Sequence, residues 1–246
     1  MDARDIALQG VMPTVMAPRY TELEQLDTPG NRILMAANGV WLEVCRAWLY
    51  ARIRLAPPIR IPVPYGIVRE EMRFGFGKLP KAMVAQFIEL ARVRSPNECA
   101  AWIVWNQRTD AWKLMMLEET SVGPGHVIVN LPTLESDEHL VMDLHSHGLT
   151  EAFFSRTDNK DDKGEVKIAG VIGNLNQAAV TASFRLCANG VFLPLPFEAR
   201  KGREVIHDTQ HRSTPAHAGN KGSAGRRRRY RFTRLAAAGY HAPCDG

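Results

Sequence analysis

Four residues in the segment 143–158 have the types and spacing of a catalytic zinc site: His145, His147, Ser155 and Asp158. Residues two apart on a strand point to the same face, so the two histidines converge if the apolar run before them is a strand. Zinc binds histidine nitrogen and carboxylate oxygen at roughly 2.0 to 2.2 Å, and a catalytic site keeps three protein ligands and one open position. The spacing therefore predicts that His145, His147 and Asp158 bind Zn²⁺.

The order His-Ser-His, seven residues, then Ser-x-x-Asp resembles the JAMM motif of the JAB1/MPN metalloprotease family. This resemblance implies that His145, His147 and Asp158 hold the metal, that Ser155 stabilises the oxyanion, and that an upstream glutamate activates water. The family usually has proline after the second histidine, where this chain has Gly148. We expect this difference to change the loop and leave the ligands in place.

The upstream glutamate is predicted to be Glu98. Family members tend to have a helix, then Pro-x-Glu, then a strand, and here a helix-like segment 80–91 precedes Pro96-Asn97-Glu98 and an apolar segment, 100–105. A glutamate at the start of such a strand can lie beside a metal held by a neighbouring strand. Competing candidates are the acidic residues closer to the histidines in sequence, which are Glu118, Glu119, Glu135 and Glu138.

This combination of residues predicts a hydrolase acting on an amide or isopeptide bond. Zinc lowers the pKa of water that it binds to about 7 and polarises a carbonyl group. Glu98 would accept the proton from water and return it to the leaving amine, while Ser155 would donate a hydrogen bond to the oxyanion. The structural alternative is that His145 and His147 are strand residues with local hydrogen bonds, and that Ser155 to Asp158 only caps a helix.

The length and cysteine content of the chain limit its class. With 246 residues, 45% of them hydrophobic, the chain can form one large domain or a domain with a smaller companion. No signal peptide begins the sequence and no apolar run approaches the roughly 20 residues that span a bilayer, so we expect no membrane partner. The four cysteines are widely separated in the sequence: Cys45, Cys99, Cys187 and Cys244. We therefore expect neither a disulfide framework nor a thiolate zinc site, and a cytoplasmic location.

Residues 200–246 account for the net positive charge of the chain. They contain 11 Lys and Arg against 3 Asp and Glu, which leaves 20 against 23 in residues 1–199, although the whole chain has a net charge of +5. The segment lacks a sustained apolar period, so we expect a disordered, basic, low-complexity tail. Its arginine cluster, 226–231, can contact nucleic acid through phosphate charge, or it can be a solvated tail without that function.

The rest of the chain is predicted to form two regions. Residues 1–75 read as a smaller β-rich region that ends in a proline-rich connector, because the prolines of 56–66 exclude a helix or a central strand. Residues 76–199 alternate one helix with several strands, including single strands at 112–119 and 139–145, and Asn189-Gly190 marks a hairpin. This mixed α/β pattern agrees with the cytidine-deaminase-like sandwich that the JAB/MPN resemblance implies.

Three further segments resemble the PRTRC system protein A family, whose members are bacterial JAB-domain proteins: residues 38–44, 64–66 and 170–175. The resemblance implies a ubiquitin-like protein or peptide as substrate and a ThiF/E1-like protein as partner. Two alternatives stay open. The chain can be a non-catalytic JAB-fold scaffold that binds partners without metal, or a DNA-associated mobile-element protein that acts through its arginine-rich tail.

Overall fold

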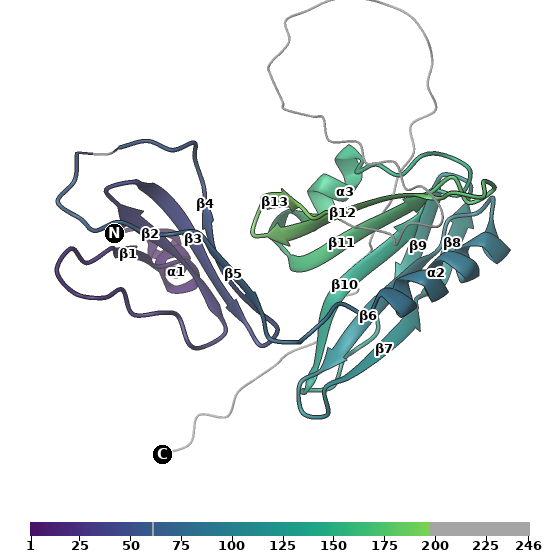
Figure 1. Ribbon diagram of the computed structural model, residues 1–246, viewed down its shortest axis with the longest axis horizontal. Coiled ribbons are helices and arrows are strands. Elements are labelled where there is room, and N and C mark those ends of the chain that lie inside the picture. Colours follow the sequence, from purple (N-terminus) through teal and green to yellow (C-terminus); the bar gives the residue numbers. More distant parts are fainter. Residues whose placement is uncertain (61, 197–246) are drawn as a thin grey trace, which may run out of the picture. The chain divides into compact units, whose positions relative to one another are not determined.

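The computed structural model describes residues 1–60 and 62–196, and the basic tail predicted at 200–246 lies outside this part of the chain. The chain divides into two compact units (Figure 1). The first comprises residues 1–80 with the short segments 105–111 and 136–139, and the second comprises the remaining described residues. None of the helices in the described part is long and apolar enough to cross a membrane.

The first unit contains a nine-residue helix and a five-stranded sheet in the order β1-β2-β3-β4-β5. β1 pairs parallel with β2, and the other neighbours are antiparallel. Trp41 and Trp48 are buried in this unit and belong to its core. The predicted β-rich region is confirmed, with these elements: α1 (Ala3–Val11), β1 (Thr14–Met16), β2 (Gly30–Ala36), β3 (Gly39–Arg46), β4 (Leu49–Arg54) and β5 (Glu71–Phe74).

The proline-rich segment has no helix or strand where it is described, as predicted, but it is a loop between β4 and β5 of one sheet and not a connector between the two regions. Residues 55–60 and 62–70, between β4 and β5, form neither helix nor strand. Proline removes a backbone donor and fixes one backbone angle, which prevents these residues from extending the sheet. The helix α1 was not predicted from the sequence; Asp2 caps it by accepting a hydrogen bond from the backbone N–H of Arg4.

The second unit is built on a six-stranded sheet in the order β13-β12-β11-β10-β6-β7, with a separate hairpin of β8 and β9. Helix α2 (Lys81–Arg94) begins directly after Pro80 and buries Val84, Phe87 and Ala91 at helical spacing. The strands are β6 (Ala100–Asn106), β7 (Ala111–Met116), β8 (Glu118–Gly123), β9 (His126–Asn130), β10 (Glu138–Ser146), β11 (Val166–Gly173), β12 (Thr181–Ala188) and β13 (Val191–Pro194).

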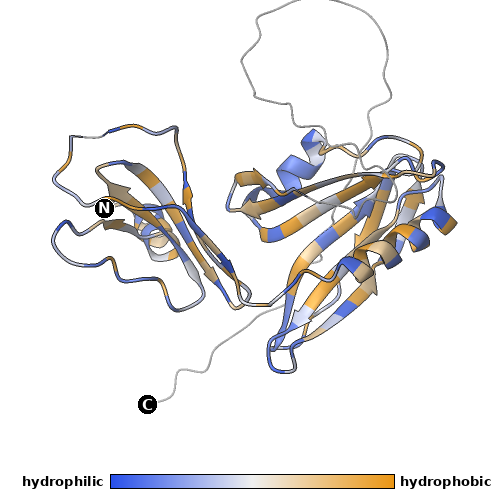
Figure 2. Ribbon diagram, viewed as in Figure 1, coloured by the Kyte–Doolittle hydropathy of each residue, from blue (hydrophilic) through white to orange (hydrophobic). Residues whose placement is uncertain are grey.

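The sheet is mixed, which confirms the predicted α/β class. β10 pairs parallel with β11, while β11 with β12 and β12 with β13 are antiparallel. The central strands β6 and β10 contain many apolar residues (Figure 2). The predicted hairpin at Asn189-Gly190 joins β12 to β13, and both residues have the positive φ, 47° and 90°, that a tight two-residue turn requires.

The prediction of one strand over 112–119 was wrong. The chain leaves the six-stranded sheet after Met116, and Glu118 begins β8 of the separate hairpin. Leu117 lies between them, buried, with its backbone N–H bonded to the carbonyl of Ala100 at 3.0 Å. A continuous run of strand-forming residues does not reveal such a change of sheet, because both pieces have the same local preference.

Candidate functional site

The two histidines lie where β10 ends. The backbone N–H of Ser146, between them, donates to the carbonyl of Cys99 at 2.9 Å, and that of His147 donates to Ile172 at 2.8 Å. The strand is therefore bonded to a neighbour on each side at this point. Because residues two apart on an extended segment share a face, this pairing directs both imidazoles to the same side of the sheet.

The structure brings His145, His147 and Asp158 together. The Nε2 atoms of the two histidines are 3.3 Å apart, and His145 Nε2 is 3.7 Å from Asp158 Oδ1. One possible ligand atom from each of the three residues lies within 4.8 Å of the others. All three side chains are buried, with 7% of the residue surface exposed at most.

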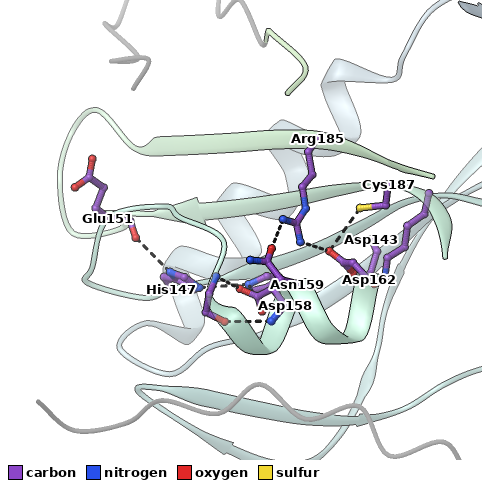
Figure 3. Close-up of polar contacts among 11 residues, drawn as sticks. Asp143, His147, Glu151, Asp158, Asn159, Asp162, Arg185 and Cys187 are labelled. Atoms are coloured by element: carbon purple, nitrogen blue, oxygen red, sulfur yellow. Dashed lines mark hydrogen bonds and ion pairs between the residues drawn. The ribbon is translucent and has the colours of Figure 1, made fainter. Parts of the chain in front are cut away.

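The ring orientation of His147 is fixed from behind. Its Nδ1 is 3.2 Å from the carbonyl oxygen of Glu151, which can only accept, so Nδ1 carries the proton and donates (Figure 3). Neutral His147 then has a lone pair on Nε2, the atom that faces His145. Burial lowers the pKa of His145 to about 4, against the opposing charge of Asp158. Burial therefore favours the neutral, metal-binding form of His145, and the contact with Glu151 turns Nε2 of His147 toward it.

Asp158 uses its two carboxylate oxygens differently. Helix α3 (Arg156–Asp161) begins with a capping box in which Asp158 Oδ2 accepts from the backbone N–H of Ser155 at 2.6 Å. Asp158 Oδ1 is buried and has no hydrogen-bond partner among the described residues. Only Oδ2 takes part in capping the helix, as the helix-cap alternative predicted. Oδ1 faces His145.

These donors fit zinc in type and spacing. Two ligands at zinc distance from a tetrahedral ion lie roughly 3.3 to 3.4 Å from each other. The observed 3.3 Å between imidazole nitrogens and 3.7 Å from nitrogen to carboxylate oxygen are close to that value. A buried carboxylate oxygen without a hydrogen bond is costly, and a cation held there would offset the cost.

Ser155 lies at the edge of this group as the N-cap residue of α3. Its Oγ accepts from the backbone N–H of Asp158 at 3.2 Å. A serine hydroxyl has one proton and two lone pairs, so accepting this bond leaves the proton available for another acceptor. The residue is partly buried.

Glu98 lies directly before the strand β6, which neighbours β10 in the sheet. The next residue, Cys99, accepts from the N–H of Ser146 and donates its own N–H to Ser146 Oγ at 3.0 Å. Glu98 is therefore next in sequence to the residue that pairs with Ser146, and its own backbone N–H donates to the carbonyl of Gly123 at 3.1 Å. The glutamate is buried, with 4% of its surface exposed.

The competing glutamates have other environments. Glu119 forms an ion pair with Arg94, and Glu118 is exposed and accepts from Asn130 at 3.2 Å. Glu135 is exposed and Glu138 is partly buried. Glu98 is the buried one among these five candidates, as a proton acceptor shielded from bulk water would be.

Gly148 follows the second histidine with φ +55°, a conformation that favours glycine. A Cβ at this position would lie 2.5 Å from the carbonyl oxygen of Pro96. Proline, with φ near −65°, does not fit this backbone. The loop thus differs from the family pattern at the expected residue.

Sequence analysis missed a network of buried charges beside the site. Lys167 Nζ is 2.6 Å from Asp143 and 2.9 Å from Asp162, and Asp162 also accepts from Arg185 at 2.6 Å (Figure 3). Burial would raise the pKa of Asp162, but Lys167 and Arg185 outweigh it and lower the value. The signal in the sequence is the presence of two cationic residues within the mostly apolar strands β11 and β12.

Comparison with known proteins gives matches to both units. A family model described as prokaryotic homologs of the JAB domain matches residues 80–187, and one described as a domain of unknown function, DUF2016, matches residues 2–75. No curated protein matches the chain significantly. Among solved structures it is similar to the solution structure of protein DSY2949 from Desulfitobacterium hafniense, with 16% identity, coverage of 53% of this chain and 96% of that chain, and a TM-score of 0.37.

The JAB match includes the whole group of predicted site residues, from Glu98 to Asp158. It also includes the helix α2 and the sheet strands from β6 to β11 that position them. Sequence motif, mixed sheet and family match therefore agree on the second unit. Residues 80–187 are therefore a domain of the JAB/MPN family, among its prokaryotic homologs.

Proposed function

We propose that the second unit is a zinc-dependent peptidase or isopeptidase of the JAMM type. The observation that carries this proposal is the convergence of His145, His147 and Asp158, three buried side chains, with Asp158 Oδ1 left without a hydrogen bond. A metal at this point, when bound, acts as a Lewis acid and makes water a nucleophile near neutral pH. The site offers three protein ligands, the number found in catalytic rather than structural zinc sites.

Glu98 is proposed as the general base and acid. Its buried carboxylate, next in sequence to the residue that pairs with Ser146, would accept a proton from the attacking water and deliver it to the leaving amine. Ser155 is proposed to stabilise the oxyanion, because its hydroxyl proton is not used in capping α3. Each role is carried by a residue that a sheet strand or a helix cap holds in place.

The proposed substrate is a ubiquitin-like protein or a peptide, and the proposed partner is a ThiF/E1-like protein, both in the cytoplasm. The support is the resemblance of residues 38–44, 64–66 and 170–175 to the PRTRC system protein A family. The reaction would trim the ubiquitin-like protein or release it from a conjugate.

Metal content tests the site first. Purified protein should contain zinc at about one ion per chain, and His147→Ala should lose it. His126→Ala is the matched control, since His126 is a strand residue of the same unit that contacts Ser121. Zinc-free wild-type protein that still binds its partners would favour a non-catalytic scaffold.

Activity on a fusion of a ubiquitin-like protein with a reporter tests the reaction. Glu98→Gln should lose cleavage by a factor of about 100 or more while it keeps the metal. Glu119→Gln, which removes a charge that pairs with Arg94, should keep both. Equal loss in the two variants, or full activity in Glu98→Gln, would contradict the assignment of the base.

A further inference from the structure

Helix α3, which carries Asp158, is too short and too polar to be stable without contacts to the rest of the unit. α3 has six residues, Arg-Thr-Asp-Asn-Lys-Asp, and none of them is apolar (Figure 2). Isolated helices of this length are unstable in water, and this one has no hydrophobic face to pack. Contacts with residues outside the helix are therefore needed to place it against the histidines, in addition to its own capping box.

Arg185 on β12 makes such contacts. Its Nη1 donates to Asn159 Oδ1, and its Nη2 donates to Asp162 Oδ2 at 2.6 Å (Figure 3). The guanidinium carbon lies 3.8 Å from the ring centroid of Phe154 and 4.0 Å from that of Phe192, so two aromatic rings contact it as well. The residue is buried, with 6% of its surface exposed.

The contacts fall on both sides of the capping segment. Phe154 directly precedes Ser155, and Asn159 directly follows Asp158. A guanidinium has a rigid, planar set of donors and also stacks on aromatic rings, so one side chain can fix both neighbours at once. Lysine at the same position would offer a single point charge without that fixed geometry.

Burying a cation is costly unless its hydrogen bonds are made. Here the charge is offset by Asp162, which is itself shared with Lys167 on the adjacent strand β11. The result is a rigid connection from the sheet strands β11 and β12 to the segment 154–162. The same sheet includes β10, which carries His145. The side chains that hold segment 154–162 and the strand that presents His145 therefore belong to one sheet.

We propose that Arg185 is a positioning residue that holds Asp158 Oδ1 and the Ser155 hydroxyl in register with the two histidines. It acts through its contacts with Phe154, Asn159 and Asp162. This inference rests on the proposed function, because it assigns the contact a purpose in metal binding. We also infer that Arg185 orders segment 154–162 in the metal-free chain.

Metal affinity tests the first statement. Cobalt(II) titration followed by visible absorption, with zinc competition, should show affinity reduced about 10- to 100-fold in Arg185→Lys and a changed cobalt spectrum. Asn159→Ala removes one acceptor at an exposed residue and should give part of the same loss. Combined, the two substitutions should cost less than the sum of the single effects, because they break the same contact.

Arg54→Lys is the matched control. Arg54 stacks on Trp41 at 4.3 Å and donates to the carbonyl of Asn38 at 3.0 Å, so it makes the same kinds of contact in the first unit. This variant should leave cobalt affinity and spectrum unchanged. Unchanged affinity in both Arg185→Lys and Asn159→Ala, with a wild-type protein that binds cobalt, would overturn the inference and leave the proposed function intact.

Amide hydrogen exchange of metal-free protein tests the second statement independently. Exchange in residues 154–162 should accelerate in Arg185→Lys, while exchange in α2 stays as in the wild type. Equal acceleration in both segments would mean a general loss of stability and count against a positioning role. Wild-type protein that binds no metal would refute the proposed function. The exchange measurement would still show whether Arg185 orders residues 154–162, because it uses metal-free protein.

Discussion

Ser155 and Asp158 cap the same helix reciprocally. The Oγ of Ser155 accepts from the backbone N–H of Asp158 at 3.2 Å, and Asp158 Oδ2 accepts from the backbone N–H of Ser155 at 2.6 Å. The arrangement uses one carboxylate oxygen and the lone pairs of one hydroxyl. The second oxygen of Asp158 and the hydroxyl proton of Ser155 are thereby available to the site.

Replacing Ser155 with alanine separates the structural role of this residue from its proposed catalytic role. We expect Ser155→Ala to lower the free energy of unfolding by about 1 kcal/mol through loss of the cap. Metal affinity should change little, because the backbone N–H still binds Asp158 Oδ2. The turnover number should fall about 100-fold for loss of an oxyanion donor. Steady-state kinetics would contradict this role if Ser155→Ala kept full turnover; Ser155→Thr should restore it.

Gly148 should not tolerate the residue that the family usually has there. Gly148→Pro cannot adopt φ +55°, and Gly148→Ala places a Cβ 2.5 Å from the carbonyl oxygen of Pro96. We expect both variants to lose about 1 to 3 kcal/mol in urea unfolding. Gly164→Ala is the control, since a Cβ there meets nothing within 4 Å. A fully stable Gly148→Pro protein would mean that the loop can take another conformation.

The stability of the metal-free protein should depend on His145 at acidic pH. Burial lowers the pKa of this residue from 6.5 to about 4, so between these values the unfolded chain binds the proton and the folded chain does not. The free energy of unfolding should therefore fall as pH decreases through this window, by at most about 1.4 kcal/mol per pH unit. Above pH 6.5 the effect is absent, because both states are then neutral.

The measurement is urea unfolding of metal-free wild type and His145→Gln at several pH values. Burial, Asp158 and Asp162 raise the pKa of Asp161 to about 6, which favours the folded state as pH falls over much of the same window. Comparing the two proteins removes this opposite effect, because Asp161 is present in both. A stability difference that does not change with pH would show that His145 is not held neutral by burial.

Removal of metal should lower the melting temperature of the second unit. A ligand that binds only the folded state stabilises it by about 2.7 kcal/mol at one hundred times its dissociation constant. Added chelator should therefore destabilise wild type, and excess zinc should reverse the change. His147→Ala should respond to neither, whereas His126→Ala should behave like wild type, as calorimetry can establish. A chelator response in His147→Ala would place the metal elsewhere.

Much of the site follows from local rules that a sequence displays. The pair His145 and His147 share a face because side chains alternate along a strand, and Ser155 with Asp158 form a capping box because residues three apart meet at a helix start. The hairpin at Asn189-Gly190 was predictable for the same reason, since a two-residue turn depends on its own residues.

The tertiary structure decided how these local pieces meet. The approach of Asp158 Oδ1 to His145, the pairing of Cys99 with Ser146 and the hydrogen bonds of Arg185 join residues that are 13 to 47 positions apart in the sequence. No local pattern encodes such distances, because they depend on which strands become neighbours and on how buried charges find partners. The sequence by itself determined which atoms could bind a metal, and packing decided that they face one another.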